Sequence, residues 1–136
     1  MMYNEGTIIA LSSAPGSGAI AIIRLSGEDA LSKTDLFFKS KSGKKLSESS
    51  GYSISYGDLV DNDEIIDEVV VSVYKAPHSY TGENIIEISC HGSIYIQQRI
   101  LSLFTNAGVR LASPGEFTVR AYLNNKKDLS QAEAVG

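Results

Sequence analysis

The segment 19–25 constrains the fold of this chain more than any other. It reads Ala-Ile-Ala-Ile-Ile-Arg-Leu, an apolar run whose only charge is Arg24. A short apolar run of this kind predicts a central β-strand that is buried on both faces. The Gly-rich segment 14–18 predicts a tight turn from an earlier strand over 7–11. The fold must therefore accommodate a charge inside a buried strand, which costs free energy unless the charge has a partner.

The remaining segments predict both strands and helices. Strand patterns occupy the segments 52–59, 68–74, 84–90 and 109–112. Three segments show helix patterns with capping signals. The first is 27–38, with Ser26 as N-cap, and the second is 93–106, which Gly108 follows. The third begins at Ser113, which forms a capping box with Glu116. The polar stretch 39–51 predicts a loop. Because strands and helices do not alternate strictly, we expect an α+β domain with a mixed sheet and flanking helices.

Composition narrows the class of protein. A chain of 136 residues with 43% hydrophobic residues is typical of one globular domain. The net charge is −4, and the lysines of 39–45 lie among Ser and Gly, so we interpret them as a solvated loop. Without a basic stripe, the chain is a poor candidate for binding nucleic acid by itself. The sequence has no signal segment and only one cysteine, and none of its apolar runs approaches the length of about 20 residues that spans a bilayer. We therefore expect a cytoplasmic location and no membrane contact.

Several segments resemble reactive motifs but lack the residues that the chemistry needs. The Gly-rich turn 15–18 has no lysine and leads into a strand, whereas a phosphate loop ends in Gly-Lys-Ser/Thr and leads into a helix. Cys90 and His91 are neighbours on a predicted strand, so we expect opposite faces and a half-buried structural thiol. His78 and His91 lack the spacing of a metal-ligand pair. We assign no catalytic residue and no metal site.

Arg24 and Glu87 are the strongest candidates for a functional site, because each lies inside an apolar strand. An unpaired charge buried there would cost several kcal/mol. Two interpretations stay open: the residues pair with each other or lie at strand ends, or they line a pocket and contact a polar ligand. Lys126 stands between two helix signals, and it is either a solvated loop lysine or a contact for a ligand anion.

Three longer motifs, in fixed order, carry a family resemblance. They are Ala-Pro-Gly-Ser-Gly-Ala-Ile-Ala-Ile-Ile-Arg-Leu-Ser-Gly (14–27), Pro-His-Ser-Tyr-Thr-Gly-Glu-Asn-Ile-Ile-Glu-Ile-Ser-Cys-His-Gly (77–92) and Pro-Gly-Glu-Phe-Thr-Val-Arg-Ala-Tyr-Leu-Asn-Asn-Lys-Lys-Asp-Leu-Ser-Gln-Ala-Glu-Ala-Val (114–135). Together they resemble the N-terminal domain of the MnmE (TrmE) family of tRNA-modifying GTPases, over essentially the whole chain. The family's usual Gly-Arg-Gly-Gly is Gly-Ser-Gly-Ala here, and its His-Gly-Gly is His-Gly-Ser, so Ser17 removes an arginine and Ser93 starts a predicted helix.

The resemblance implies a fold, a ligand and partners. Such domains resemble the folate-binding fold of the glycine-cleavage T-protein, bind a tetrahydrofolate derivative, usually represented by 5-formyltetrahydrofolate, and form a homodimer. The full protein adds a helical domain, a GTP-binding domain that uses Mg and K, and a C-terminal cysteine motif. With the flavoprotein MnmG (GidA), it modifies the wobble uridine of certain tRNAs at carbon five, in the carboxymethylaminomethyl/aminomethyl uridine pathway.

The family's folate contacts correspond to Arg24, Glu87 and Lys126 in this chain. The resemblance implies a tetrahydrofolate-binding and dimerisation domain over 1–125. It also implies the start of a helical domain over 126–136, where a helix signal at 128–131 precedes the last residue, Gly136. We therefore expect a piece of a longer protein.

Three hypotheses of function follow. The first is a binding and dimerisation module of a GTPase, which by itself does not hydrolyse GTP because it contains no phosphate loop. The second is a free-standing, folate-dependent aminomethyl transferase, which would show turnover by this chain alone. The third is a structural interaction domain without a ligand, which a folate titration would leave unchanged in stability.

Overall fold

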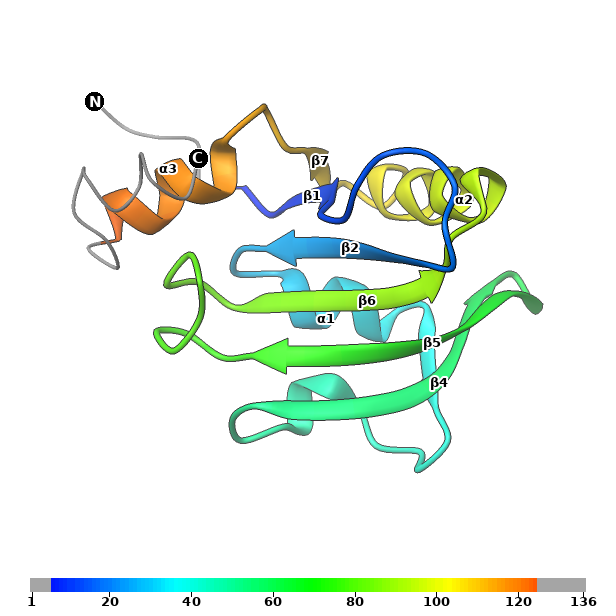
Figure 1. Ribbon diagram of the computed structural model, residues 1–136. Coiled ribbons are helices and arrows are strands. Elements are labelled where there is room, and N and C mark those ends of the chain that lie inside the picture. Colours follow the sequence, from blue (N-terminus) through cyan, green and yellow to red (C-terminus); the bar gives the residue numbers. More distant parts are fainter. Residues whose placement is uncertain (1–5, 125–136) are drawn as a thin grey trace.

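The computed structural model of the protein describes residues 6–124. In this part of the chain, seven strands form one sheet in the order β3-β4-β5-β6-β2-β1-β7 (Figure 1). Neighbouring strands are antiparallel, except that β1 and β7 are parallel. The predicted α+β class, a mixed sheet with flanking helices, is confirmed.

The elements follow the predicted order with some changes in their limits. The strands are β1 (Ile8–Leu11), β2 (Ile20–Ser26), β3 (Phe38–Ser40), β4 (Ser53–Asp61), β5 (Glu64–Tyr74), β6 (Ile85–His91) and β7 (Arg110–Leu111). The helices are α1 (Ala30–Asp35), α2 (Ile94–Thr105) and α3 (Glu116–Leu123), with a short 3-10 helix, η1 (Leu46–Glu48), before β4.

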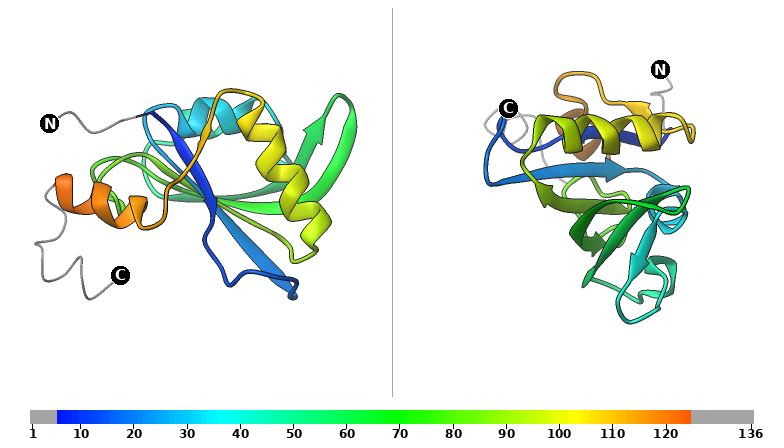
Figure 2. Two further views of the ribbon diagram at one scale, coloured as in Figure 1. Left: turned by 90° about the horizontal axis from the view of Figure 1, so that it is seen from above. Right: turned by 90° about the vertical axis from the view of Figure 1, so that its right-hand side faces the viewer.

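The hydrophobic core lies between the sheet and helices α1 and α2, which cover the same face (Figure 2). Ile23 and Leu25 of β2 point into this core and are fully buried. The opposite side of β2 carries Ile20, which is 66% exposed, and the half-buried Arg24. The prediction that 19–25 is buried on both faces is therefore wrong for the part of the chain that the structure describes.

We call the side of the sheet away from α1 and α2 the open face. Cross-strand partners in an antiparallel sheet point to the same side. The open face therefore carries two rows of partners that run across β2, β6, β5 and β4: Ile22-Ser89-Val70-Tyr56 and Arg24-Glu87-Ser72-Ile54.

The segment after β2 also differs from the prediction. Ser26 is the last residue of β2 and not a helix N-cap. Helix α1 begins at Ala30 with Asp29 as its N-cap, and it ends at Asp35, short of the predicted residue 38. The physical reason is Gly27, whose φ of +145° redirects the chain in a conformation that residues with a side chain rarely adopt.

Strand β3 forms inside the stretch that the sequence predicts as a loop. Its residues pair with β4, so that Phe38 lies opposite Leu59 and Ser40 opposite Gly57. A Cβ atom on Gly57 would lie 2.2 Å from the Lys39 carbonyl oxygen, so only glycine permits this close approach. Long-range pairing here overrides the local polarity that predicted a loop.

The helix caps agree with the sequence at α2 and in part at α3. The Ser93 hydroxyl accepts a hydrogen bond from the Ile96 N–H over 3.2 Å, and Gly108 has a φ of +96°, as predicted for the two ends of α2. At α3 the N-cap is Gly115 and not Ser113. Half of the predicted capping box forms, because the Glu116 carboxylate accepts from the Ser113 N–H over 2.8 Å.

The predicted boundary at residue 125 and the predicted helical start over 126–136 lie at or beyond the end of the described residues, so both remain predictions. None of the helices within residues 6–124 has the length and apolar character needed to cross a membrane.

Candidate ligand-binding site

Arg24 and Glu87 meet on the open face. They are directly opposite each other on β2 and β6. Arg24 Nε and Nη2 donate to Glu87 Oε2 over 2.9 and 2.8 Å. The side chains are 22% and 23% exposed, so the ion pair is only partly shielded from water. The interpretation that the two residues pair with each other is confirmed, and the pairing satisfies the charge that segment 19–25 carries into the sheet.

The pair uses only part of what each side chain offers. Both Arg24 nitrogens bond to the same carboxylate oxygen of Glu87. Within residues 6–124, neither Arg24 Nη1 nor Glu87 Oε1 has another hydrogen-bond partner. Arg24 Nη1, a donor, and Glu87 Oε1, an acceptor, therefore each remain available to a polar ligand.

A cavity of about 410 Å³ lies beside Arg24, while Glu87 contacts Arg24 from outside the cavity lining. Arg24 lines it together with Leu11 and Ser12 at the end of β1, with Tyr80 between β5 and β6, and with Gly115, Phe117 and Thr118 around α3. Its volume falls within the range of about 300–1,000 Å³ that is usual for small-molecule sites.

Two aromatic rings contact the Arg24 guanidinium in this cavity. The centroid of the Phe117 ring is 5.2 Å from Arg24 Cζ, and the centroid of the Tyr80 ring is 5.4 Å from it. Both distances are within the range of cation–π attraction. The cavity thus combines a cation with aromatic surface, an arrangement suited to a flat, polar heterocycle.

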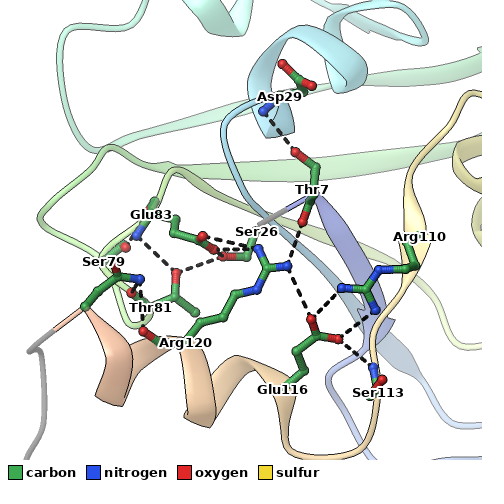
Figure 3. A network of polar contacts seen from close by, with 12 residues as sticks. Thr7, Ser26, Asp29, Ser79, Thr81, Glu83, Arg110, Ser113, Glu116 and Arg120 are labelled. Atoms are coloured by element: carbon green, nitrogen blue, oxygen red, sulfur yellow. Dashed lines mark hydrogen bonds and ion pairs between the residues drawn. The ribbon is translucent and has the colours of Figure 1, made fainter. Parts of the chain in front are cut away.

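A buried network of charges holds α3 beside the cavity (Figure 3). Arg120, which is 1% exposed, donates from Nη1 to both oxygens of Glu83 over 3.1 and 3.2 Å. Its Nη2 donates to Glu116 over 3.2 Å and to the Gly6 carbonyl over 2.7 Å. Arg110 donates to both oxygens of Glu116, over 3.1 Å to Oε1 and over 2.6 Å to Oε2, the oxygen that Arg120 also contacts.

The network continues into the loop between β5 and β6. The Ser26 hydroxyl lies 2.8 Å from the Thr81 hydroxyl and donates to Glu83 over 2.7 Å. The Asn124 side chain donates to the Thr81 carbonyl over 2.9 Å. The end of β2, the loop and α3 therefore form one hydrogen-bonded unit, and that unit fixes the parts of the cavity wall that Tyr80 and α3 supply.

Sequence reasoning missed Arg120, Glu83 and Arg110, and it assigned Glu116 only to a helix cap. One signal was present, since Glu116 and Arg120 are spaced i, i+4 and therefore share a helix face. That spacing is as common on solvated helix surfaces as in buried networks, so it did not indicate burial. Lys126, the third candidate residue, lies outside the described residues.

The interpretation of Cys90 as a structural thiol agrees with the structure, although the side chain is fully rather than half buried. Burial, with a further contribution from Asp67, raises the pKa of the Cys90 thiol to about 11. His91 points to the opposite side, is exposed, and its Nδ1 lies 2.7 Å from Asp67 Oδ1. Among residues 6–124, no group of three or more His, Cys, Asp or Glu side chains is arranged to hold a metal ion.

Comparison with known proteins identifies the family. The family model described as "GTP-binding protein TrmE N-terminus" matches residues 7–126. The chain is 55% identical over 131 residues to the tRNA modification GTPase MnmE of Parabacteroides distasonis, covering 95% of this chain and 28% of that protein. It is 54% identical to the MnmE of Flavobacterium johnsoniae and 52% identical to that of Clostridioides difficile, in each case over 134 residues, 98% of this chain and 29% of the relative.

The chain thus spans less than a third of the length of these relatives. The match by the family model and the level of identity lead to the same assignment. The chain belongs to the TrmE N-terminal family, the N-terminal domain of tRNA modification GTPases of the MnmE type.

Proposed function

We propose that this domain binds a tetrahydrofolate derivative at the Arg24–Glu87 pair. The observation that carries the proposal is the half-engaged ion pair beside a cavity with aromatic walls. No catalytic residue or metal is needed for this role, because the domain supplies binding and positioning. The ligand that represents the class in the tests below is 5-formyltetrahydrofolate.

The residues present fit such a ligand. A reduced pterin carries a ring N–H beside an amino group, and a carboxylate such as Glu87 accepts from both. Its carbonyl oxygen, or the carboxylates of its tail, are acceptors for the Arg24 guanidinium. Hydrogen bonds that involve charged groups contribute about 1.5–3 kcal/mol each, so the loss of one lowers affinity about ten- to a hundredfold.

Lys126 completes the proposed set of folate contacts. The Asn124 side chain bonds to Thr81, the neighbour of the cavity-lining Tyr80. We propose that the ammonium group of Lys126, two positions after Asn124 in the sequence, binds the carboxylate tail or a carbonyl of the ligand.

A thermal-shift titration tests this binding. If 5-formyltetrahydrofolate binds only the folded chain, a concentration of about one hundred times its Kd adds about 2.7 kcal/mol of stability. For a chain of this size that corresponds to a rise of about 10 °C in Tm. Folic acid and glutamate alone serve as controls for the reduced ring and for the tail. An unchanged Tm at millimolar ligand would reject the proposal and leave the domain with a purely structural role.

We further propose that the domain forms a homodimer through the open face. Four apolar residues of this face are well exposed: Ile20, Ile54, Tyr56 and Val70, with exposed fractions of 66, 60, 49 and 37%. Exposed apolar residues gathered on a sheet face that α1 and α2 leave uncovered are a common feature of association sites. A second copy is the occupant that the family resemblance implies.

Sedimentation velocity tests the dimer. The parent chain should sediment as a dimer at micromolar concentration, and Val70→Glu should sediment as a monomer of unchanged far-UV circular dichroism. Ile94→Glu is the matched control, because Ile94 is similarly exposed but lies on α2, away from the open face. A monomeric parent, or equal behaviour of the two variants, would reject this surface.

For the full-length protein, we propose the activity that the family implies. It is a cytoplasmic GTP hydrolase, dependent on Mg and K, that modifies the tRNA wobble uridine with MnmG as partner. The 136-residue chain has no Gly-Lys-Ser/Thr phosphate loop, so it should release no phosphate from GTP. Measurable one-carbon transfer by this chain alone would instead favour a free-standing aminomethyl transferase.

A further inference from the structure

One hydrogen bond between two side chains of the cavity wall joins segments that are distant in the sequence. The hydroxyl groups of Tyr80 and Thr118 lie 2.8 Å apart and join the loop before β6 to α3, across 38 positions of sequence. Both residues line the cavity, and both are half-buried. The bond is therefore located at the proposed ligand site and not in the hydrophobic core.

The same two segments also supply the rings that contact Arg24. Tyr80 belongs to the loop, and Phe117 is the residue before Thr118 on α3. Because Tyr80 bears both the ring and the hydroxyl, the bond to Thr118 restricts where its ring can lie relative to Arg24. The Phe117 ring is positioned by α3 itself and not by this bond.

The bond contributes little to holding α3 in place. The helix is already anchored to the same loop by Arg120, which bonds to Glu83, and by Asn124, which bonds to Thr81. Arg120 is fully buried, whereas the Tyr80–Thr118 bond is partly accessible to water. Removing the latter should therefore leave the fold intact and change only the geometry of the cavity.

We propose that Tyr80 and Thr118 form a latch that positions the Arg24 guanidinium for its ligand. Glu87 restrains one edge of the guanidinium, and the Tyr80 ring that the latch fixes restrains its plane together with the Phe117 ring, so that Nη1 is presented in one orientation. The ligand that benefits is a flat heterocycle with an acceptor group, which is the class of the proposed function, and this inference rests on that function for its ligand. Tyr80 and Thr118 are positioning residues, and they act through Arg24.

The test combines a ligand-free and a ligand-bound measurement on the 136-residue chain. In ¹H–¹⁵N spectra, the Nε–H resonance of Arg24, assigned with Arg24→Lys, reports hydrogen bonding to Glu87 and the ring currents of the two aromatic residues. The latch predicts that Tyr80→Phe and Thr118→Val shift or broaden this resonance, and that Thr118→Ser restores it because the hydroxyl is retained. Tyr95→Phe is the control, since the Tyr95 hydroxyl accepts an exposed hydrogen bond from Arg99, away from the cavity on α2.

Calorimetry with 5-formyltetrahydrofolate supplies the second readout. Tyr80→Phe and Thr118→Val should each weaken binding about three- to tenfold, the range for one neutral hydrogen bond, while Thr118→Ser and Tyr95→Phe bind as the parent does. The urea midpoint of each variant should stay close to that of the parent. A parent that fails to bind rejects the proposed function, while the Nε–H result still decides on the latch. An Arg24 resonance that no variant moves, or a Thr118→Ser variant as defective as Thr118→Val, overturns the latch.

Discussion

Replacing Arg120 by Met removes the charge at the centre of the buried network and keeps most of the apolar stem. The guanidinium makes hydrogen bonds to Glu83, Glu116 and the Gly6 carbonyl, and the side chain is 1% exposed. Deleting one partner of a buried ion pair costs about 3–5 kcal/mol, because the remaining charge stays buried without compensation.

The structure places the expected cost at the lower end of that range. Glu116 is 2% exposed but keeps Arg110, which bonds to it over 2.6 Å. Glu83 is 19% exposed and keeps the Ser26 hydroxyl, so water and one hydrogen bond compensate part of its charge. We therefore expect a loss of about 3 kcal/mol in the free energy of unfolding, a large fraction of the about 5–15 kcal/mol typical of a domain.

Urea unfolding followed by circular dichroism measures this loss. The midpoint should fall while the m value stays the same, and Tm should drop by about 10 °C. The matched control is Arg99→Met, the same substitution on α2, where the partners Glu64 and Asp61 are exposed and a change within experimental error is expected. A loss below about 1 kcal/mol for Arg120→Met, or one equal to that of the control, would refute the role given to the network.

Three further predictions concern single residues. The raised pKa of Cys90 lowers its thiolate fraction near neutral pH roughly 100-fold, so Ellman's reagent should label the folded chain at least that much more slowly than the unfolded chain. The free energy of unfolding should also fall as the pH rises from about 9 to about 11, because only the thiol of the unfolded chain ionises in that range. A Cβ on Gly92 would lie 2.0 Å from the Gly18 carbonyl oxygen, so Gly92→Ala should lower the free energy of unfolding, measured with urea, by about 1–3 kcal/mol. Gly18→Ala, whose Cβ meets nothing within 4 Å, should leave it unchanged. Ser93→Ala removes the N-cap side chain of α2 and should lower the free energy of unfolding by about 1 kcal/mol, whereas Ser93→Asp should retain the stability of the parent.

The strand pattern and the charges within it could be predicted from the sequence, because both depend on local spacing. Arg24 and Glu87 are conspicuous as charges in apolar strands. Their pairing depends on the register of β2 against β6, which the sequence alone left open between two interpretations. Burial of 19–25 on both faces was wrong, because within residues 6–124 α1 and α2 cover only one side of the sheet, and α3 contacts the other side at Arg24 while Ile20 stays exposed.

Features that arise from contacts between distant segments were not predictable from local pattern. Arg120 is part of a motif that resembles the family, yet on a helix it has the spacing of any surface charge. Its burial depends on the loop that carries Glu83, 37 positions earlier in the sequence. Strand β3 likewise depends on Gly57 in β4, which allows the backbones to approach. In both cases tertiary packing decides what local polarity cannot.

Isothermal titration calorimetry of the 136-residue chain with 5-formyltetrahydrofolate, repeated with Glu87→Gln, tests the central claim most directly. The control is Glu64→Gln, the same substitution at an exposed position at the start of β5. The account predicts saturable binding by the parent and by Glu64→Gln, and binding about ten- to a hundredfold weaker by Glu87→Gln. Equal affinity of the parent and Glu87→Gln would contradict it.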